Sequence, residues 1–122
     1  MNIDKIDIKG KTVAVITGDE KIITDVQSAL DLLMTVKYDA GTKLIAVDKQ
    51  VITEDFFILG TGLAGEILQK FINYQAKFAV YGDFSKYTSK PLKDFIYESN
   101  KGRDIFFAAS VTDAAEKLAS AG

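Results

Sequence analysis

The fold is decided by one stretch, Gly60-Thr61-Gly62-Leu63-Ala64-Gly65-Glu66-Ile67-Leu68-Gln69-Lys70-Phe71. The stretch is typical of a glycine-flanked turn that opens a helix. Thr61 is the expected N-cap, because its hydroxyl can accept a hydrogen bond from a free backbone N–H one turn further on. Apolar residues then recur at helical spacing, at Leu63, Ala64, Ile67, Leu68, Phe71 and Ile72. We therefore expect a central helix from about Thr61 to Tyr74 whose apolar stripe faces the core.

The residues before this stretch predict two strands, a helix and a third strand. Ile6 and Ile8 alternate with charged residues, a turn follows at 9–11, and residues 13–16 form a denser apolar run, so the pair is typical of an antiparallel hairpin. Thr24-Asp25-Val26-Gln27 has the form of a capping box. The next helix is expected to end at Gly41, and its predicted apolar stripe comprises Ile23, Val26, Leu30, Leu33 and Met34. Residues 44–47 are the third strand.

The residues after the central helix alternate strands and helices again. Residues 78–81 predict a fourth strand, a polar loop follows to residue 90, and Pro91 fits the first turn of a helix. Residues 105–108 predict a fifth strand, and Ser110 is the expected N-cap of a last helix. The order β-β-α-β-α-β-α-β-α requires parallel pairing with right-handed crossovers. We predict one α/β domain over residues 1–122, with a mostly parallel five-stranded sheet and an antiparallel N-terminal edge strand.

Composition narrows the possible chemistry. The 122 residues include no cysteine and no histidine, which removes thiolate nucleophiles, histidine-based triads and typical zinc sites. The net charge of −2 disfavours nucleic acid as a partner. The acidic residues Asp19, Glu20, Asp25, Glu54 and Asp55 lack the spacing of a calcium loop and are expected to be solvated or to cap helices. We expect no metal, no cofactor and no catalytic set.

The start of the chain and its apolar runs suggest a location. No apolar run approaches the length of about 18 residues that a membrane span needs. Residues 1–5 lack the apolar segment of a signal peptide. We therefore expect a cytoplasmic domain that does not enter a membrane.

Two candidate binding stretches follow strands that are expected to end at the same edge of the sheet, where open α/β sheets bind ligands. One is the turn Gly60, Thr61 and Gly62, and the other is the loop residues Asp83, Ser85, Lys86, Tyr87, Thr88, Ser89 and Lys90. Their hydroxyls, cations and helix start could hold a phosphate or a carboxylate. The alternative is a solvated loop that caps and turns the chain. Thr61 itself could be a phosphoacceptor, an anion ligand or an ordinary N-cap.

Small residues on the first turn of the central helix also need a reason, because a helix former there would be more favourable by about 1 kcal/mol per site. Gly62 and Gly65 could let a ligand or partner approach the backbone, or could let a neighbouring helix pack closely. We therefore regard Gly65 and the adjacent Glu66 as candidates for close packing or for an interface.

The element order resembles the STAS fold, typified by the anti-sigma factor antagonists of sporulating bacteria. Residues 15–20 leading into a helix resemble the strand-Gly-Glu-Leu-Asp step of that fold, and residues 85–96 resemble its Ser-Pro entry to the third helix. Thr61-Gly62-Leu63 is similar to the Asp-Ser-Ser-Gly-Leu signature, in which a hydroxyl residue before glycine is phosphorylated. Gly60 stands where the signature has a polar residue. The resemblance implies a regulatory domain that binds proteins.

A second resemblance is longer and more specific. Residues 60–74, residues 82–90, Asp94-Phe95-Ile96 and Glu98-Ser99-Asn100 look like a family of small bacterial proteins known as domain of unknown function 4180. This resemblance implies a bacterial cytoplasmic protein with no established activity.

Two functional hypotheses follow. The first is a STAS-like, non-enzymatic regulatory or interaction module whose unknown protein partner binds the edge that carries Thr61 and residues 83–90. The second is a small-molecule or anion-binding protein, with or without weak enzymatic activity, that uses the same edge. The sequence leaves the oligomeric state open.

Overall fold

Strands and helices alternate in the order expected from the sequence. The computed structural model describes residues 1–121. Its strands are β1 (Asn2–Ile8), β2 (Lys11–Thr17), β3 (Leu44–Asp48), β4 (Lys77–Tyr81) and β5 (Ile105–Ala108). Its α-helices are α1 (Val26–Ala40), α2 (Leu63–Asn73), α3 (Lys90–Asn100) and α4 (Val111–Ser120). Three short 3-10 helices lie between β3 and α2, namely η1 (Lys49–Val51), η2 (Glu54–Phe57) and η3 (Leu59–Thr61).

The five strands form one sheet in the order β1-β2-β3-β4-β5. β1 pairs antiparallel with β2, and every later neighbouring pair is parallel. The predicted mostly parallel sheet with an antiparallel N-terminal edge strand is therefore confirmed. A two-residue turn joins β1 to β2, and both Lys9 (φ 55°) and Gly10 (φ 79°) have positive φ, as a type I′ hairpin turn requires.

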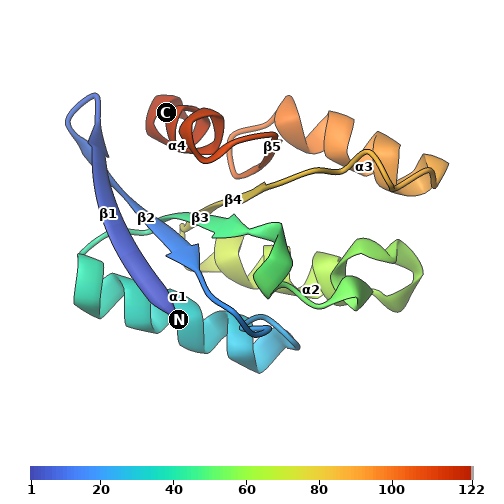
Figure 1. The fold of residues 1–122 in the computed structure, drawn as a ribbon, viewed down its shortest axis with the longest axis horizontal. Helices are drawn as coiled ribbons and strands as arrows, with labels where there is room; N and C mark the ends of the chain where they lie inside the picture. Colours follow the sequence, from blue (N-terminus) through green and yellow to red (C-terminus); the bar gives the residue numbers. More distant parts are fainter. Residues whose placement is uncertain (122) are drawn as a thin grey trace.

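Helices cover both faces of the sheet, with α1 and α2 on one side of the strands and α4 on the other (Figure 1). The larger apolar cluster lies under α1 and α2 and includes Ile16, Val47, Phe78 and Val80 from the strands. The smaller cluster lies under α4 and includes Val13, Val15, Ala46, Ala79 and Phe106 from the strands. The sheet therefore separates two cores, and α4 is the helix that covers the second.

The remaining helix, α3, packs alongside β5, which is the edge strand opposite β1 (Figure 1). Its last residue, Asn100, donates from Nδ2 to the Phe107 carbonyl (3.1 Å) and accepts at Oδ1 from the Phe107 N–H (2.8 Å). The side-chain amide thus satisfies both backbone groups that Phe107 presents to the outside of the sheet, as a sixth strand would do.

The start of α1 differs from the sequence prediction by one residue. Asp25 is the N-cap, its carboxylate accepts from the Ser28 N–H (2.7 Å), and Ser28 Oγ accepts from the Asp25 N–H (3.0 Å). The capping box is therefore Asp25–Ser28 and not Thr24–Gln27. The buried residues of the helix itself are Ala29, Leu32, Leu33 and Val36, of which only Leu33 was predicted. The predicted Ile23 is fully buried just before the helix, and Val26 and Met34 are half-buried against the same cluster. Leu30 is only half-buried.

The start of α2 also corrects the prediction. The helix begins at Leu63, and its N-cap is Gly62 in the left-handed conformation (φ 78°), without a side-chain cap. Thr61 belongs to η3, so its predicted role as N-cap was wrong. The buried face of α2 matches the predicted stripe at Ala64, Ile67, Leu68 and Phe71. The exception is Ile72, whose side chain is 40% exposed.

Candidate functional site

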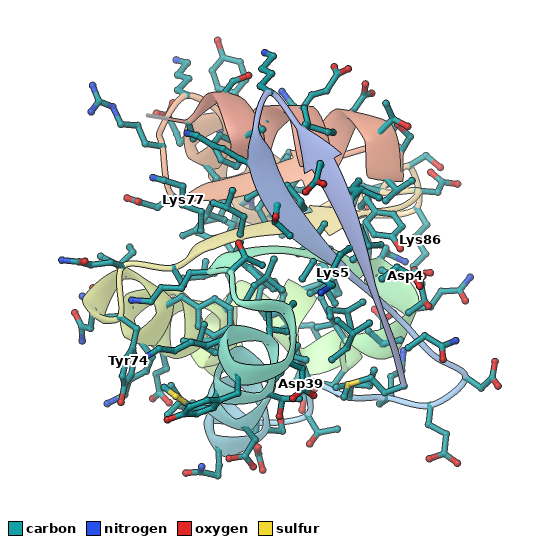
Figure 2. The ribbon with its side chains drawn as sticks, turned by 90° about the vertical axis from the view of Figure 1, so that its left-hand side faces the viewer. Asp4, Lys5, Asp39, Tyr74, Lys77 and Lys86 are labelled. Carbon is teal, nitrogen blue, oxygen red and sulfur yellow. The ribbon has the colours of Figure 1, made fainter. Side chains whose placement is uncertain are left out.

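A cleft of about 350 Å³ joins the two candidate stretches at the carboxyl edge of the sheet. It lies between the segment η2–η3, which follows β3, and the loop that leads from β4 to α3. We call it the apolar cleft, and its lining residues are Phe57, Ile58, Leu59, Gly60, Lys86, Tyr87, Thr88, Ser89, Pro91 and Leu92. Figure 2 shows Lys86 on the opposite side of the molecule from Lys77, the first residue of β4.

The Glu54 carboxylate holds two residues that line the cleft, Lys86 and Tyr87, in place. The Tyr87 hydroxyl donates to Glu54 Oε2 (2.8 Å), and Lys86 Nζ donates to Glu54 Oε1 (3.3 Å). Glu54 belongs to η2, more than thirty residues earlier in the chain. These two contacts, which we call the Glu54 junction, connect the loop after β4 to the segment after β3.

Aromatic contacts also fix the loop that contributes Tyr87 and Lys86 to the Glu54 junction. The Tyr87 ring stacks on the buried ring of Phe57, with centroids 5.2 Å apart and planes 24° from parallel. Phe84 meets Phe107 of β5 edge-on at 5.6 Å. Offset-stacked and edge-on pairs of this kind stabilise beyond their buried area. The loop is thus fixed to η2 and to β5 by side chains, although its backbone is irregular.

Lys49, the first residue after β3, is the cationic neighbour of the cleft that the sequence interpretation missed. Its Nζ lies 4.9 Å from the centroid of the Tyr87 ring and 5.9 Å from that of Phe57. Lys86 Nζ lies 5.2 Å from the Tyr87 centroid, so two ammonium groups flank one ring. The stem of Lys49 passes close to Gly82, where an added Cβ would lie only 2.9 Å from the Lys49 Cβ.

The charges at the Glu54 junction shift one another's pKa. Burial lowers the pKa of Lys49, and the positive charge of Lys86 lowers it further. Burial acts to raise the pKa of Glu54, but the hydrogen bonds from Tyr87 and Lys86 outweigh it and leave that pKa below its usual value. Burial and then the Glu54 hydrogen bond raise the pKa of the Tyr87 hydroxyl, which stays protonated as a donor.

The cleft brings together only some of the predicted site residues. Gly60, Lys86, Tyr87, Thr88 and Ser89 line it. The remaining loop residues make local contacts. The Ser85 N–H donates to Asp83 Oδ1 (2.8 Å), and Lys90 pairs with Asp94 (2.6 Å). Hydrogen bonds from the Ser85 side chain and then from its N–H lower the pKa of Asp83. Ser89 also accepts at long range from the Leu92 N–H (3.5 Å) as the N-cap of α3. A binding role for any of these residues stays a prediction.

The Thr61 hydroxyl is already engaged. It lies 2.8 Å from the Asp55 carbonyl and 2.9 Å from the Ile58 carbonyl as their donor, and it accepts weakly from the Leu63 N–H (3.3 Å). A phosphate on this oxygen would remove the proton that holds both carbonyls. Phosphorylation of Thr61 stays a prediction. It would break hydrogen bonds within the segment η2–η3 in addition to changing the charge of the surface.

Gly65 and Glu66 lie on the exposed side of α2. A Cβ built at Gly65 meets no heavy atom within 4 Å among the described residues, so the expected close packing of a neighbouring helix is not observed. The alternative, that these two residues contact a partner, stays a prediction.

The cleft combines an apolar lining with polar groups that are hydrogen-bonded to each other. The carboxylate and the phenol that a proton transfer would need are bonded to each other at the Glu54 junction. Nothing in residues 1–121 groups three or more acidic side chains closely enough to hold a metal ion. The apolar lining, with Ile58 at 56% exposure beside it, offers contact area to an apolar group instead.

The family follows from the sequence profile. The profile described as Domain of unknown function (DUF4180) matches residues 8–118. The chain belongs to this family. The match covers the Glu54 junction, the apolar cleft and Asn100, so these features lie within the DUF4180 domain.

The expected likeness to anti-sigma factor antagonists also occurs among solved structures. The DUF4180 chain resembles the crystal structure of a protein from Thermotoga maritima that is described as a candidate anti-sigma factor antagonist. The two share 12% sequence identity over 96% of this chain and 94% of the other, with a TM-score of 0.47. A likeness at this level assigns no residue and no partner to the DUF4180 chain. No curated protein matches the sequence.

The α-helices of the DUF4180 chain are short or polar. In the part of the chain that the structure describes, none has both the length and the apolar character to cross a membrane.

Proposed function

We propose that the chain is a regulatory protein-interaction module that takes a short apolar segment of a partner protein into the apolar cleft. One observation carries the proposal, namely that two stretches far apart in sequence form a cleft of about 350 Å³ with an apolar floor. A cavity of this size accepts one or two large side chains of a partner. The partner segment would lie along the loop before α3, as helix and strand ligands lie in grooves.

The surroundings of the cleft supply the features of a docking surface. Ile58 is an exposed apolar residue beside a polar rim of Lys86, Thr88 and Ser89. Interfaces commonly combine an apolar centre with such a rim. The floor is rigid, because Phe57 is buried and stacked on Tyr87. A rigid floor lowers the entropy cost of binding.

The proposal can be tested without knowing the partner. A phage library of random peptides of about 12 residues is selected against the immobilised chain, and the enriched peptides are synthesised and titrated calorimetrically. We expect them to share an apolar anchor residue. Their affinity should fall at least about tenfold in Ile58→Asp, because an ionised carboxylate at the cleft opposes apolar burial.

A matched control separates the cleft from the rest of the surface. Ile72→Asp introduces the same carboxylate on α2, away from the cleft lining, and should leave the affinity unchanged. Equal binding to both variants would disprove the proposal. The competing anion-binding hypothesis predicts a different result, in which inorganic phosphate raises the unfolding temperature and Lys49→Met abolishes that rise.

A further inference from the structure

The two edges of the sheet are treated differently. At the β5 edge, α3 packs alongside the strand and Asn100 bonds to both backbone groups of Phe107. At the β1 edge, β2 is the only strand among residues 1–121 that pairs with β1. Figure 2 shows β1 in front of the molecule, with Asp4 and Lys5 on it and no segment of residues 1–121 covering its outer side. A seven-residue strand therefore presents unpaired backbone groups to the surroundings.

The hairpin turn determines which groups these are. In a two-residue type I′ hairpin the residues that flank the turn, here Ile8 and Lys11, exchange both backbone hydrogen bonds, and such pairs alternate along the ladder. The even-numbered residues of β1 therefore bond to β2. The N–H and C=O groups of Ile3, Lys5 and Asp7 point outward.

Charge then discriminates between the possible self-pairings. Two identical antiparallel strands are related by a two-fold axis perpendicular to the sheet. Side chains of directly opposite residues lie on the same face of the sheet, so the residue at the axis is opposite the same residue of the second copy. An axis at Asp4 would oppose Asp4 to itself, and an axis at Lys5 would oppose Lys5 to itself. An axis at Ile6 instead places Lys5 opposite Asp7 of the second copy, twice, and places the two Ile6 side chains together. Opposite charges stabilise a cross-strand pair and like charges destabilise it.

We propose that two copies of the chain pair antiparallel along β1, centred on Ile6, to form a continuous ten-stranded sheet. The outward backbone groups of Lys5 and Asp7 bond across the axis, and their side chains pair above them. Ile6 already packs against the cluster under α4, so its contact with the second Ile6 extends an existing apolar surface. Among the registers centred on residues 4 to 7, the charges on β1 favour only the one centred on Ile6, because the other three oppose a charged residue to itself.

Charge variants test the register. Sedimentation equilibrium from about 10 µM to 1 mM should show a monomer–dimer equilibrium for the wild type. Lys5→Glu and Asp7→Lys should each weaken the dimer at least about tenfold, because each places like charges opposite one another. An equimolar mixture of the two variants should dimerise again, since both cross-strand pairs are then opposite in sign. Lys93→Glu, the same charge change on α3, should leave the dimer unchanged.

A cysteine variant tests the centre of the axis in a chain that has no cysteine of its own. Ile6→Cys places two thiols at a Cα separation of about 4.5–5.5 Å, which a disulfide can span. Mild oxidation should cross-link this variant but not Asp4→Cys, whose copies would lie about 13 Å apart in the same register. Circular dichroism confirms that each variant is folded. A wild type that stays monomeric at 1 mM, a mixture that fails to dimerise, or faster cross-linking of Asp4→Cys would overturn the proposal.

Discussion

Glu54 shows how much one exposed side chain can organise. Its side chain is 53% exposed, yet its carboxylate joins the segment after β3 to the loop after β4 through Tyr87 and Lys86. Because solvent screens it, the pair with Lys86 contributes little stability by itself. Its value is geometric, since it fixes the wall of the apolar cleft against Phe57.

The Glu54 junction has a definite pH dependence. The pKa of Glu54 in the folded chain lies below its ordinary value of 4.5, so the carboxylate stabilises the fold above about pH 4.5. That contribution is lost as the pH falls through the folded-state pKa. We expect Glu54→Gln to lower the free energy of unfolding by less than about 1 kcal/mol at pH 7, and the difference from wild type to shrink as the pH falls below 4.5.

Urea denaturation at pH 7, 5 and 3 measures this difference. Glu20→Gln, in the exposed segment before α1, removes the same charge without a junction and serves as the control. If the loss of unfolding free energy in Glu54→Gln became larger at acidic pH, the junction would not depend on the ionised carboxylate.

The contacts between residues that are far apart in the sequence, such as Glu54 with Lys86 and Tyr87, were the least predictable part of the site. The expected loop residues Lys86, Tyr87, Thr88 and Ser89 and the turn residue Gly60 do line one cleft, because the edge rule for parallel strands places them there. Glu54 was expected to be solvated or to cap a helix, since nothing local links it to Lys86. Lys49 could have been found by the same edge rule, because it directly follows a buried strand.

At the level of elements, the start of α2 shows why a cap is hard to predict. Thr61 has the right residue type, but its hydroxyl donates backward to the carbonyl of Asp55 in η2 and to that of Ile58, which lies between η2 and η3. Gly62 can take the left-handed conformation at little cost, so the chain turns there and the helix begins at Leu63. The apolar stripe was predictable because its spacing depends only on the helix period. The cap depended on a competing partner six residues away.

Two glycines of this element should respond to alanine in opposite directions. Gly62→Ala forces a Cβ into the left-handed region and should destabilise the chain by about 1–2 kcal/mol. Gly65→Ala adds a Cβ in open space inside a helix and should stabilise it by about 0.5–1 kcal/mol. Urea midpoints of the two variants and wild type decide the matter. A loss of stability in Gly65→Ala would show that the helix does not include residue 65 as described.

At the scale of the whole molecule, the sheet divides the core into two clusters. Ile67 belongs to the cluster under α1 and α2, whereas Leu118 belongs to the cluster under α4, and both are fully buried. The strand order and the parallel pairing were predictable, because helices between strands leave few alternatives. The placement of α4 alone on one face was not predicted, since the periodicity of a helix does not reveal which face it covers.

The division predicts additivity across the sheet. We expect Ile67→Val to cost about 0.5–1.5 kcal/mol and Leu118→Ala about 2–5 kcal/mol. The double variant should lose the sum within about 0.5 kcal/mol, because the sites share no partner. Combining Ile67→Val with Phe71→Leu, one turn away in the same cluster, should depart from additivity by more than that. Denaturant unfolding of the five variants provides the free energies. A strong interaction between Ile67 and Leu118 would mean that the strands transmit packing changes from face to face.

The order in which the elements are made gives the α4 layer a further consequence. Each strand pairs with the strand synthesised just before it, so the sheet can grow as the chain leaves the ribosome without any strand being inserted between two others. The helix that covers Val13, Val15 and Phe106, however, follows all five strands. A nascent chain therefore carries a nearly finished sheet with one bare apolar face until residues 111–120 emerge. We expect the growing chain to be most exposed to aggregation, and to bind chaperones, during that interval.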